Sequence, residues 1–299
     1  MLPLRQLEAF HAVVINGSMT EAAKSLRISQ PAVSRLVSTL EETVGFRLFK
    51  RMSGGLRPTP EASYLFDEVE KALAHLNHIT RLAEDLQDLK MGHLRVACLP
   101  GFATSLLPRV LAQFLKSRPG LTLTLEPRAP NRIEEWVAAR QFDVGLSEGF
   151  QENPAVVSEP ILIRTVCVVP KKHKLSKKKS LTAADLRDVP MIVTNREHKI
   201  FLALKEQFRQ AGVPLQISAE TRQFAPACIM ASEGLGVSVV SEIDAREYEN
   251  EHLVVIPFYP IIPFEINVLF PAYMPRSIVT LEFVEAFKQS INSFRIDTG

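Results

Sequence analysis

The chain carries, between residues 29 and 40, the stretch Ser29-Gln30-Pro31-Ala32-Val33-Ser34-Arg35-Leu36-Val37-Ser38-Thr39-Leu40. Its apolar residues recur at the i, i+3, i+4, i+7 spacing of a helix with one buried face, and they are Val33, Leu36, Val37 and Leu40. Pro31 falls in the first turn, where its missing N–H removes no hydrogen bond. The opposite face suits the major groove of DNA, because an amide can pair with adenine and a guanidinium with guanine. The polar residues of that face are Gln30, Ser34, Arg35 and Ser38.

Two shorter helices are predicted before this stretch. The first covers residues 4–15, where apolar residues lie at helical spacing, and Asn16-Gly17 ends it. The second opens at Ser18, which fits a capping box with Glu21, so that each side chain would accept from the other residue's backbone N–H. Arg27-Ile28-Ser29 then forms a turn. The three segments together predict a helix-turn-helix.

A short basic hairpin is predicted after the third helix. Gly45 ends that helix, apolar and basic residues then alternate over residues 47–51, and Gly54-Gly55 turns the chain back. The tip of this hairpin, or wing, carries Lys50, Arg51 and Arg57. Because a small helical packing module with solvated charges has the same periodicity, the pattern alone leaves DNA binding and simple packing both open.

The charge of the chain is distributed unevenly. The 299 residues hold 35 Lys and Arg against 33 Asp and Glu, a net charge of +2, which by itself argues against a nucleic-acid partner. Residues 1–60, however, hold eight basic and four acidic residues, whereas residues 61–90 hold three basic and seven acidic ones. A head of charge +4 thus precedes a segment of charge −4, and the head offers a surface for phosphates.

The acidic segment has a heptad pattern. Thr59 can cap a helix that begins at Pro60, and apolar residues then recur at alternating spacings of four and three. These residues are Leu65, Val69, Ala72, Leu76, Ile79, Ala83 and Leu86. A seam of that period favours pairing with a second helix, and hence dimerisation, over a helix packed only on its own domain.

Strands and helices alternate from His93 to the end of the chain, which predicts a parallel sheet with helices on its faces. The predicted strands cover residues 94–99, 121–125, 142–146, 166–170, 191–193, 215–217, 234–240 and 263–270. The predicted helices cover residues 106–114, 133–139, 201–210, 226–233 and 278–294. In sheets of this kind, ligands bind at the carboxyl ends of the strands.

The amino-terminal segments resemble those of LysR-type transcriptional regulators. The motifs match in order and spacing over residues 1–65, and they are Leu4–Phe10, Gly17–Ala23, Ser29–Arg35, Leu40-Glu41, Gly45–Phe49 and Arg57–Pro60. Ala62 departs from the family, where many members have Gly, but it opens a helix as well. The resemblance implies an α+β fold with an N-terminal winged helix-turn-helix, a long linker helix and two α/β lobes of periplasmic-binding-protein type.

The same resemblance implies the domain boundaries. The domains are a DNA-binding domain over residues 1–58, a linker or dimerisation helix over 59–90 and an effector-binding domain over 91–299. The chain is expected to cross between the two lobes of the effector-binding domain near 161–168 and again near 265–270. Lobe I therefore comprises 91–163 and 266–299, and lobe II comprises 164–265.

Individual DNA contacts are also implied by the resemblance. The candidates are Ser29, Gln30, Pro31, Ala32, Ser34, Arg35, Ser38, Lys50 and Arg51. The resemblance implies that the residues from Gln30 to Arg35 in this set face bases and that Ser38 faces phosphate. It places Lys50 and Arg51 of the wing at the minor groove.

A small ligand is expected in the cleft between the lobes, above the carboxyl ends of the strands. The candidates for contact are Pro100, Gly101, Phe102, Ala103, Thr104, Ser105, Asn131, Ser147, Glu148, Thr194, Asn195 and Phe224, with Pro130 and Arg196 beside them. Backbone N–H groups of residues 102–105 would hold a carboxylate and Glu148 would meet an amine, which predicts a carboxylate or amino-acid-like effector. The same positions are typical of turns and helix caps, which is the structural alternative.

Three other patterns favour a structural interpretation. Gly145-Leu146-Ser147-Glu148-Gly149 matches the nucleophile elbow of hydrolases, but a loop sequence follows where that elbow needs a helix. The lysine-rich stretch 171–179 lacks a recognition helix and suits a solvated loop. The three cysteines, Cys98, Cys167 and Cys228, are expected to be buried thiols. We therefore predict no catalytic residue, no metal site and no cofactor.

The preferred hypothesis is a sequence-specific DNA-binding transcriptional regulator that is not an enzyme. Its predicted partners are double-stranded promoter DNA, a small-molecule effector, further copies of itself in a dimer or tetramer, and RNA polymerase. The most apolar stretch, residues 254–275, is broken by four prolines, so we expect no membrane segment and a cytoplasmic location. The alternative is a cytoplasmic solute-binding protein or enzyme that uses the two-lobed α/β domain.

Overall fold

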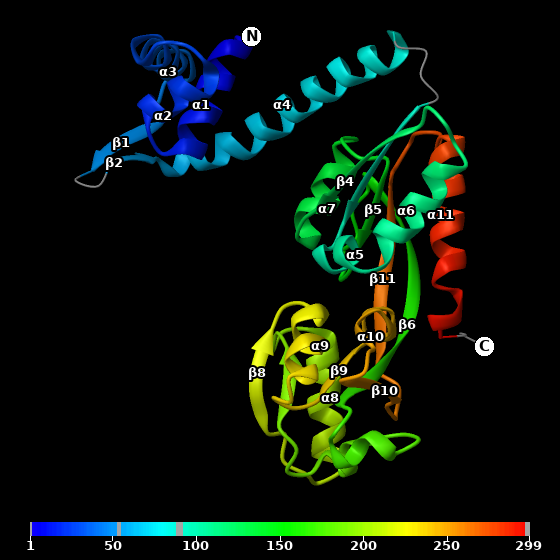
Figure 1. Cartoon of the computed structure of the whole chain (residues 1–299). Helices are drawn as coiled ribbons and strands as arrows, with labels where there is room; N and C mark the ends of the chain where they lie inside the picture. The colour runs from blue at the N-terminus through cyan, green and yellow to red at the C-terminus, as the bar shows by residue number, and fades with distance from the viewer. Residues whose placement is uncertain (1, 53–54, 88–91, 297–299) are drawn as a thin grey trace. The chain divides into compact units, whose positions relative to one another are not determined.

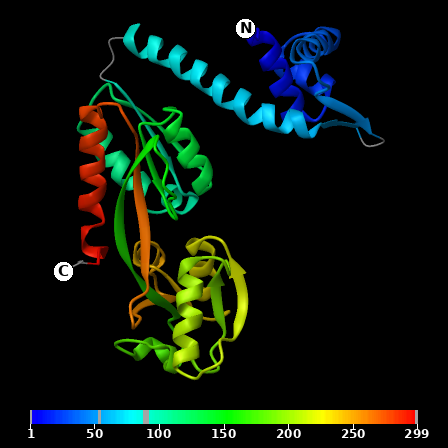
Figure 2. The same ribbon diagram turned by 180° about the vertical axis from the view of Figure 1, so that it is seen from behind.

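The computed structural model describes residues 2–52, 55–87 and 92–296, and the side chains at 51, 52, 55, 74, 77, 78 and 80–87 lie outside that description. The chain separates into two compact units, Met1–Asp88 and Leu89–Gly299. Figure 1 shows the elements of each unit, and Figure 2 shows them from behind.

The first unit is a helix-turn-helix followed by a hairpin and a long helix. Its elements are α1 (Leu4–Asn16), α2 (Met19–Leu26), α3 (Gln30–Val44), β1 (Phe49–Met52), β2 (Gly55–Pro58) and α4 (Pro60–Gln87). The predicted helices and the wing are thus confirmed. Val33 and Val37 of α3 pack against Ala22 and Ala23 of α2, because alanine side chains let the two helices approach closely.

The ends of the short helices follow the sequence signals, with one exception. Ser18 caps α2 by accepting from the backbone N–H of Thr20 at 3.2 Å, and Gly45 ends α3 with φ +81°. The expected capping box is wrong, because Glu21 bonds the ammonium of Lys24 at 2.7 Å instead of returning to Ser18. A cation three residues along the same helix face offers this carboxylate a stronger donor than a backbone N–H does.

Glu41 joins α3 to the hairpin. One carboxylate oxygen accepts from the backbone N–H of Leu48 at 2.7 Å and of Phe49 at 3.4 Å. The other oxygen accepts from the guanidinium of Arg47 at 2.8 Å. The Glu41 side chain is only 11% exposed, so little solvent competes for these bonds. The carboxylate therefore holds the start of β1 on the third helix.

Glu41→Gln is expected to loosen the hairpin, because an amide accepts weaker hydrogen bonds than a carboxylate and loses the ion pair with Arg47. We expect the first unit to lose about 1–3 kcal/mol of its free energy of unfolding. The measurement is thermal denaturation of the full chain by circular dichroism, with hydrogen exchange at the amides of Leu48 and Phe49 as the local readout. Glu42→Gln, at the exposed neighbouring position, is the matched control. Equal effects of the two substitutions would contradict this role of Glu41.

The second unit contains two lobes. Lobe I holds β3 (His93–Cys98), α5 (Pro100–Thr104), α6 (Leu106–Lys116), β4 (Thr122–Pro127), α7 (Pro130–Ala138), β5 (Val144–Ser147) and α11 (Ile278–Ser290). Lobe II holds β7 (Met191–Thr194), α8 (Lys199–Gln210), β8 (Ile217–Thr221), α9 (Phe224–Ser232), β9 (Ser238–Ser241), α10 (Glu242–Tyr248) and β10 (Leu253–Pro257). Two long strands run from one lobe to the other in Figure 1, and they are β6 (Val156–Pro170) and β11 (Pro263–Pro271). Short 3-10 turns cover Lys174–Lys177, Ala183–Leu186 and Asn292–Phe294.

The main sheet is mixed, which corrects the prediction of a parallel sheet. Seven strands take part in the order β10-β6-β11-β5-β3-β4, with β9 also paired to β6. Strands β3, β4 and β5 are parallel, as are β7 and β8 in a separate pair. β6 and β11 are antiparallel because the chain leaves lobe I along the first and returns along the second.

Four elements depart most from the sequence prediction. β6 begins at Val156, ten residues before the predicted strand, since its first half mixes polar residues and Pro160 into the apolar pattern. α10 and β10 were not predicted, because a seven-residue acidic helix shows too little periodicity. The helix α5 precedes α6 at a place where only a turn was expected.

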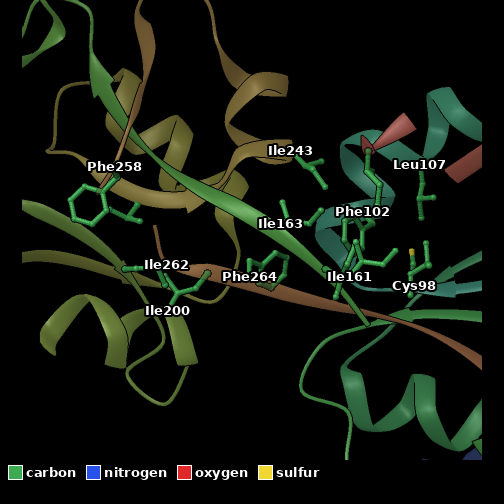
Figure 3. Close-up of a cluster of buried hydrophobic side chains, with 14 of the residues drawn as sticks. Cys98, Phe102, Leu107, Ile161, Ile163, Ile200, Ile243, Phe258, Ile262 and Phe264 are labelled. Carbon is green, nitrogen blue, oxygen red and sulfur yellow. The ribbon is translucent and has the colours of Figure 1, made fainter. Parts of the chain in front are cut away.

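One apolar core continues through both lobes. Figure 3 shows this cluster following the two crossover strands, from Cys98 and Leu107 on one side to Phe258 and Ile262 on the other. The buried hydroxyl of Thr165 on β6 adds a hydrogen bond to the carbonyl of Ile262 at 2.7 Å. The lobes therefore share a core at their junction.

The three cysteines are free and buried, as predicted. Burial raises the pKa of the Cys98 thiol to about 12, with the nearby Glu126 carboxylate adding to the effect. Burial also raises the pKa of Cys167 and of Cys228. Since the thiolate is the reactive form, these groups behave as small apolar side chains. In the part of the chain that the structure describes, no helix has the length and apolar character needed to cross a bilayer.

Candidate functional site

The predicted DNA-contact residues lie on two elements of the first unit. Gln30, Pro31, Arg35 and Ser38 are exposed on α3, whereas Ala32 and Ser34 are half-buried on the same helix. Ser29 caps that helix by accepting from the backbone N–H of Ala32 at 3.4 Å. Within the described residues, Arg35 forms no ion pair, so its guanidinium is available on the exposed face. The exposed face of α3 therefore presents the amide and guanidinium that base recognition requires.

The hairpin brings two basic side chains together. Lys50 and Arg57 lie directly opposite each other in the antiparallel register of β1 and β2, and both are exposed. Like charges in such a pair repel, so a polyanion at this surface would relieve an unfavourable contact. The structure thus adds Arg57 to the candidate set, through a register that the sequence did not reveal. The side chain of Arg51 lies outside the described part of the chain.

A pocket of about 330 Å³ lies between the two lobes of the second unit. Six of the predicted effector-contact residues line it, and they are Pro100, Gly101, Phe102, Glu148, Asn195 and Phe224. The other lining residues are Leu99, Ala129, Pro130, His198, Arg222, Gln223, Asp244 and Phe264. Because these residues come from the ends of β3, β5 and β7 and from α9 and α10, both lobes contribute to the pocket.

Six predicted residues do not line this pocket: Ala103, Thr104, Ser105, Asn131, Ser147 and Thr194. The expected carboxylate site on backbone N–H groups is also wrong. Those of Phe102 and Ala103 donate to the carbonyl of Leu99, and that of Ser105 donates to the carbonyl of Gly101. The short helix α5 uses these donors itself, so they cannot be offered to a ligand.

Ser147 is buried at the end of β5, and no helix begins there. Its hydroxyl lies 3.4 Å from the carbonyl of Glu148, and an irregular segment follows up to β6. A nucleophile elbow requires a strand-to-helix turn that exposes the serine. The structure therefore confirms that the Gly-x-Ser-x-Gly match lacks its structural context.

His198 and Glu148 connect the two lobes at the pocket. Nδ1 of His198 accepts from the backbone N–H of Ile200 at 3.1 Å, which caps α8. Nε2 of the same ring then lies 3.1 Å from the Glu148 carboxylate. The His198 ring also meets Phe224 and Phe264, whose ring centroids are 5.3 Å apart. The pocket therefore combines an aromatic wall with a carboxylate that already has a partner.

Asp244 is the second carboxylate of the pocket. Its side chain is buried, and its Oδ1 has no hydrogen-bond partner among the described residues. Burial raises the pKa of Asp244 to about 7, and the neighbouring Glu247 acts in the same direction, although hydrogen bonds partly oppose the rise. Asp244 was not among the predicted site residues, because α10 was not predicted.

The raised pKa of Asp244 predicts a stability that falls as the pH rises. Between about pH 4 and 7 the folded chain keeps a proton that the unfolded chain loses, so folding weakens by up to about 1.4 kcal/mol per pH unit. Asp244→Asn removes the buried charge and should melt at a higher temperature than the parent chain at about pH 8, with a flatter profile at lower pH. Thermal denaturation of the full chain across this range measures both effects, with Glu251→Gln, at an exposed position, as the control. An Asp244→Asn chain that melts lower than its parent at about pH 8 would contradict the prediction.

The described residues contain no group of three or more His, Cys, Asp or Glu side chains placed to hold a metal ion. The pocket instead offers Arg222 at an exposed position, the amide of Asn195 and two carboxylates. Such a set binds small polar molecules through charge and hydrogen bonds.

Two protein-family models match the chain. Residues 4–63 match the bacterial regulatory helix-turn-helix protein of the lysR family, and residues 87–292 match the LysR substrate binding domain. The chain belongs to the LysR family of transcriptional regulators. The helix-turn-helix and the pocket described above lie in the two matched regions.

Several regulators match this LysR-family chain over most of their length. Transcriptional activator protein LysR of Escherichia coli K12 is 36% identical over 282 residues, which are 94% of this chain and 90% of that protein. Regulatory protein NocR of Agrobacterium fabrum strain C58 is 32% identical over 299 residues and covers 100% of both chains. The octopine catabolism/uptake operon regulatory protein OccR of Rhizobium meliloti is 32% identical over 247 residues, 83% of this chain and 82% of that one.

A solved structure of the LysR-family regulator CbnR, complexed with its target DNA, has the same fold. It covers 96% of this chain and 99% of its own, with a TM-score of 0.74 and 23% identity. The predicted fold class is therefore confirmed. The LysR-family chain is a DNA-binding transcriptional regulator with a substrate-binding domain for its effector.

Proposed function

We propose that this LysR-family regulator binds promoter DNA through α3 and the β1–β2 hairpin, and that a carboxylate or amino-acid-like effector in the pocket modulates it. The observation that supports this most directly is the two-faced third helix. One face carries the buried side chains of Val33 and Val37, and the other exposes Gln30 and Arg35. The helix lies in residues 1–60, whose net charge is +4. A helix of this kind can enter the major groove without exposing apolar side chains.

The polar groups of the pocket support the proposed class of effector. Arg222 and Asn195 offer donors for a carboxylate, and the carboxylates of Glu148 and Asp244 offer acceptors for an amine. Phe224 and Phe264 cover an apolar part of a ligand. One relative is named as an octopine catabolism/uptake operon regulatory protein.

We propose that the pocket binds its ligand without chemically transforming it. Ser147 is buried, outside the pocket and without an elbow, and His198 is engaged by Glu148 and by the cap of α8. Binding that favours one arrangement of the regulator over another is sufficient for control of transcription, and RNA polymerase is the proposed further partner. Because the proposed partners are DNA and RNA polymerase, we propose a cytoplasmic location.

Arg35 and Lys50 should affect DNA binding in different ways. Arg35→Ala is expected to reduce the preference for the cognate site by about 1–3 kcal/mol, because a guanidinium reads a base edge. Lys50→Ala is expected to weaken binding to cognate and scrambled DNA alike and to reduce the salt dependence, because an ammonium contacts phosphate. Gel-shift titrations at several salt concentrations, with DNA flanking the gene, measure both quantities. Equal losses on cognate and scrambled DNA for Arg35→Ala would refute its role in base recognition.

We propose that α4 pairs with α4 of a second copy, which gives a homo-oligomer, a dimer or a tetramer. Leu76 and Ile79 of the predicted seam are 42% and 54% exposed, although both are apolar. Leu65 and Val69, earlier in the seam, pack within their own unit around Phe10. The seam therefore has a self-packed beginning and an exposed continuation, while the side chains of Ala83 and Leu86 lie outside the described part of the chain.

A charge placed on the exposed continuation should disrupt the oligomer. Ile79→Asp combined with Leu76→Asp is expected to shift the sedimentation coefficient toward that of the 33.4 kDa monomer, because a coiled-coil seam does not tolerate paired carboxylates. Sedimentation velocity over a range of concentrations measures the shift. Asp67→Asn, at an exposed position off the seam, is the control. An unchanged distribution for the double variant would exclude α4 as the pairing surface.

A further inference from the structure

Asp244 is a buried acid that the fold leaves incompletely satisfied. Its side chain is 3% exposed, it lines the pocket, and its Oδ1 lacks a partner among the described residues. A buried carboxylate oxygen without a partner is costly to the fold, so its presence in a native structure calls for a functional explanation. The other carboxylate of the pocket differs, because Glu148 is already engaged by His198.

We propose that Asp244 binds a positively charged nitrogen in the side chain of the effector, an ammonium or a guanidinium group, and thereby selects ligands with a cationic side chain over ligands of similar shape whose side chain is uncharged. The proposal rests on the proposed function of the pocket and specifies its ligand. It assigns to Asp244 a role that Glu148 was predicted to have. The carboxylate accepts from the cation at Oδ1, the atom that the protein leaves free.

The surroundings of Asp244 favour a cation from outside the chain. The charged residue that acts on it most clearly is Glu247, another acid, and Glu247 is itself bound by Arg109 of α6 at 2.8 Å. Gly101 of α5 lies on the facing lobe, where an added methyl would come within 3.7 Å of Oδ1. Oδ1 therefore lies against α5 of the facing lobe, at the boundary between the two lobes.

Asp244 is also well placed to transmit binding to the junction of the lobes. Glu242, two residues earlier, accepts from Arg164 of the crossover strand β6 at 2.9 Å. Arg109 of α6 holds the other end of α10 through Glu247. A ligand that neutralises Asp244 would thus stabilise a helix held by both the junction and lobe I, because it removes the cost of the buried charge.

Matched pairs of amino acids test the selection. All four probes share the α-ammonium and α-carboxylate. L-arginine and L-citrulline have nearly the same shape but differ in side-chain charge, and L-norleucine lacks the side-chain ammonium of L-lysine. Isothermal titration calorimetry of the full chain at about pH 8, with probes up to millimolar concentration, is expected to show at least one cationic probe binding about tenfold more tightly than its neutral partner. Asp244→Asn is expected to reduce that ratio to about one, while Glu251→Gln, at an exposed position, should preserve it.

Proton release gives a second readout that a purely structural role of Asp244 would not produce. At about pH 6 the free carboxyl holds a proton, so binding of a cation should release close to one proton, measured by titration in buffers of different ionisation enthalpy. Asp244→Asn should release none. This substitution keeps the shape of the side chain and removes its charge, so we expect it to fold.

Three results would overturn the proposal. They are equal binding of a cationic probe by the parent chain and by Asp244→Asn, equal binding of charged and neutral partners, and no binding of either cationic probe. Gel shifts with the same preparations distinguish failure of the Asp244 proposal from failure of the proposed function. If specific DNA binding persists, the proposed function as a regulator still stands. Binding of a dicarboxylate such as succinate in place of the cationic probes would support an effector pocket but refute the role of Asp244.

Discussion

The antiparallel pairing of β6 with β11 is the constraint on which the second unit depends. Its register runs from Pro263 opposite Arg164 to Pro271 opposite Val156, so the two strands stay paired through the junction of the lobes. Each lobe adds its own strands to this pair, β5 on one side and β10 and β9 on the other. The pocket lies where the lobes face each other, and its two walls can move only as far as these strands bend or twist.

The polar contacts around the pocket supplement this pairing. Glu148 with His198 and Arg109 with Glu247 each join one lobe to the other. Arg164 links β6 to Glu242 at the beginning of α10 and to the carbonyl of Arg295 near the end of the chain. A ligand that enters between the lobes therefore meets side chains whose partners already connect the two halves, which is how binding of a small molecule can change the balance between arrangements.

The first unit depends on local signals to a greater degree. Each of its three short helices ends or begins at a residue with an evident role, such as Ser18, Ser29 and Gly45, and the buried stripe of α3 follows helical spacing. The helix-turn-helix, the hairpin and the exposed face of α3 were therefore predictable from the sequence. The absence of the capping box could not be predicted, because Glu21 had two possible partners and it bonds the ammonium of Lys24. The pairing of Lys50 with Arg57 could not be predicted either, because it depends on the register of the hairpin.

Local sequence patterns were enough to predict the winged helix-turn-helix, the basic head and the family, because periodicity, caps and charge act within a few residues along the chain. Half of the residues predicted to contact the effector do line the pocket, and these residues follow parallel strands. The mixed sheet, the pairing of Glu148 with His198 and the position of Asp244 became evident from the folded chain alone. Those features depend on contacts between residues far apart in the chain, whose burial and electrostatics no local pattern encodes.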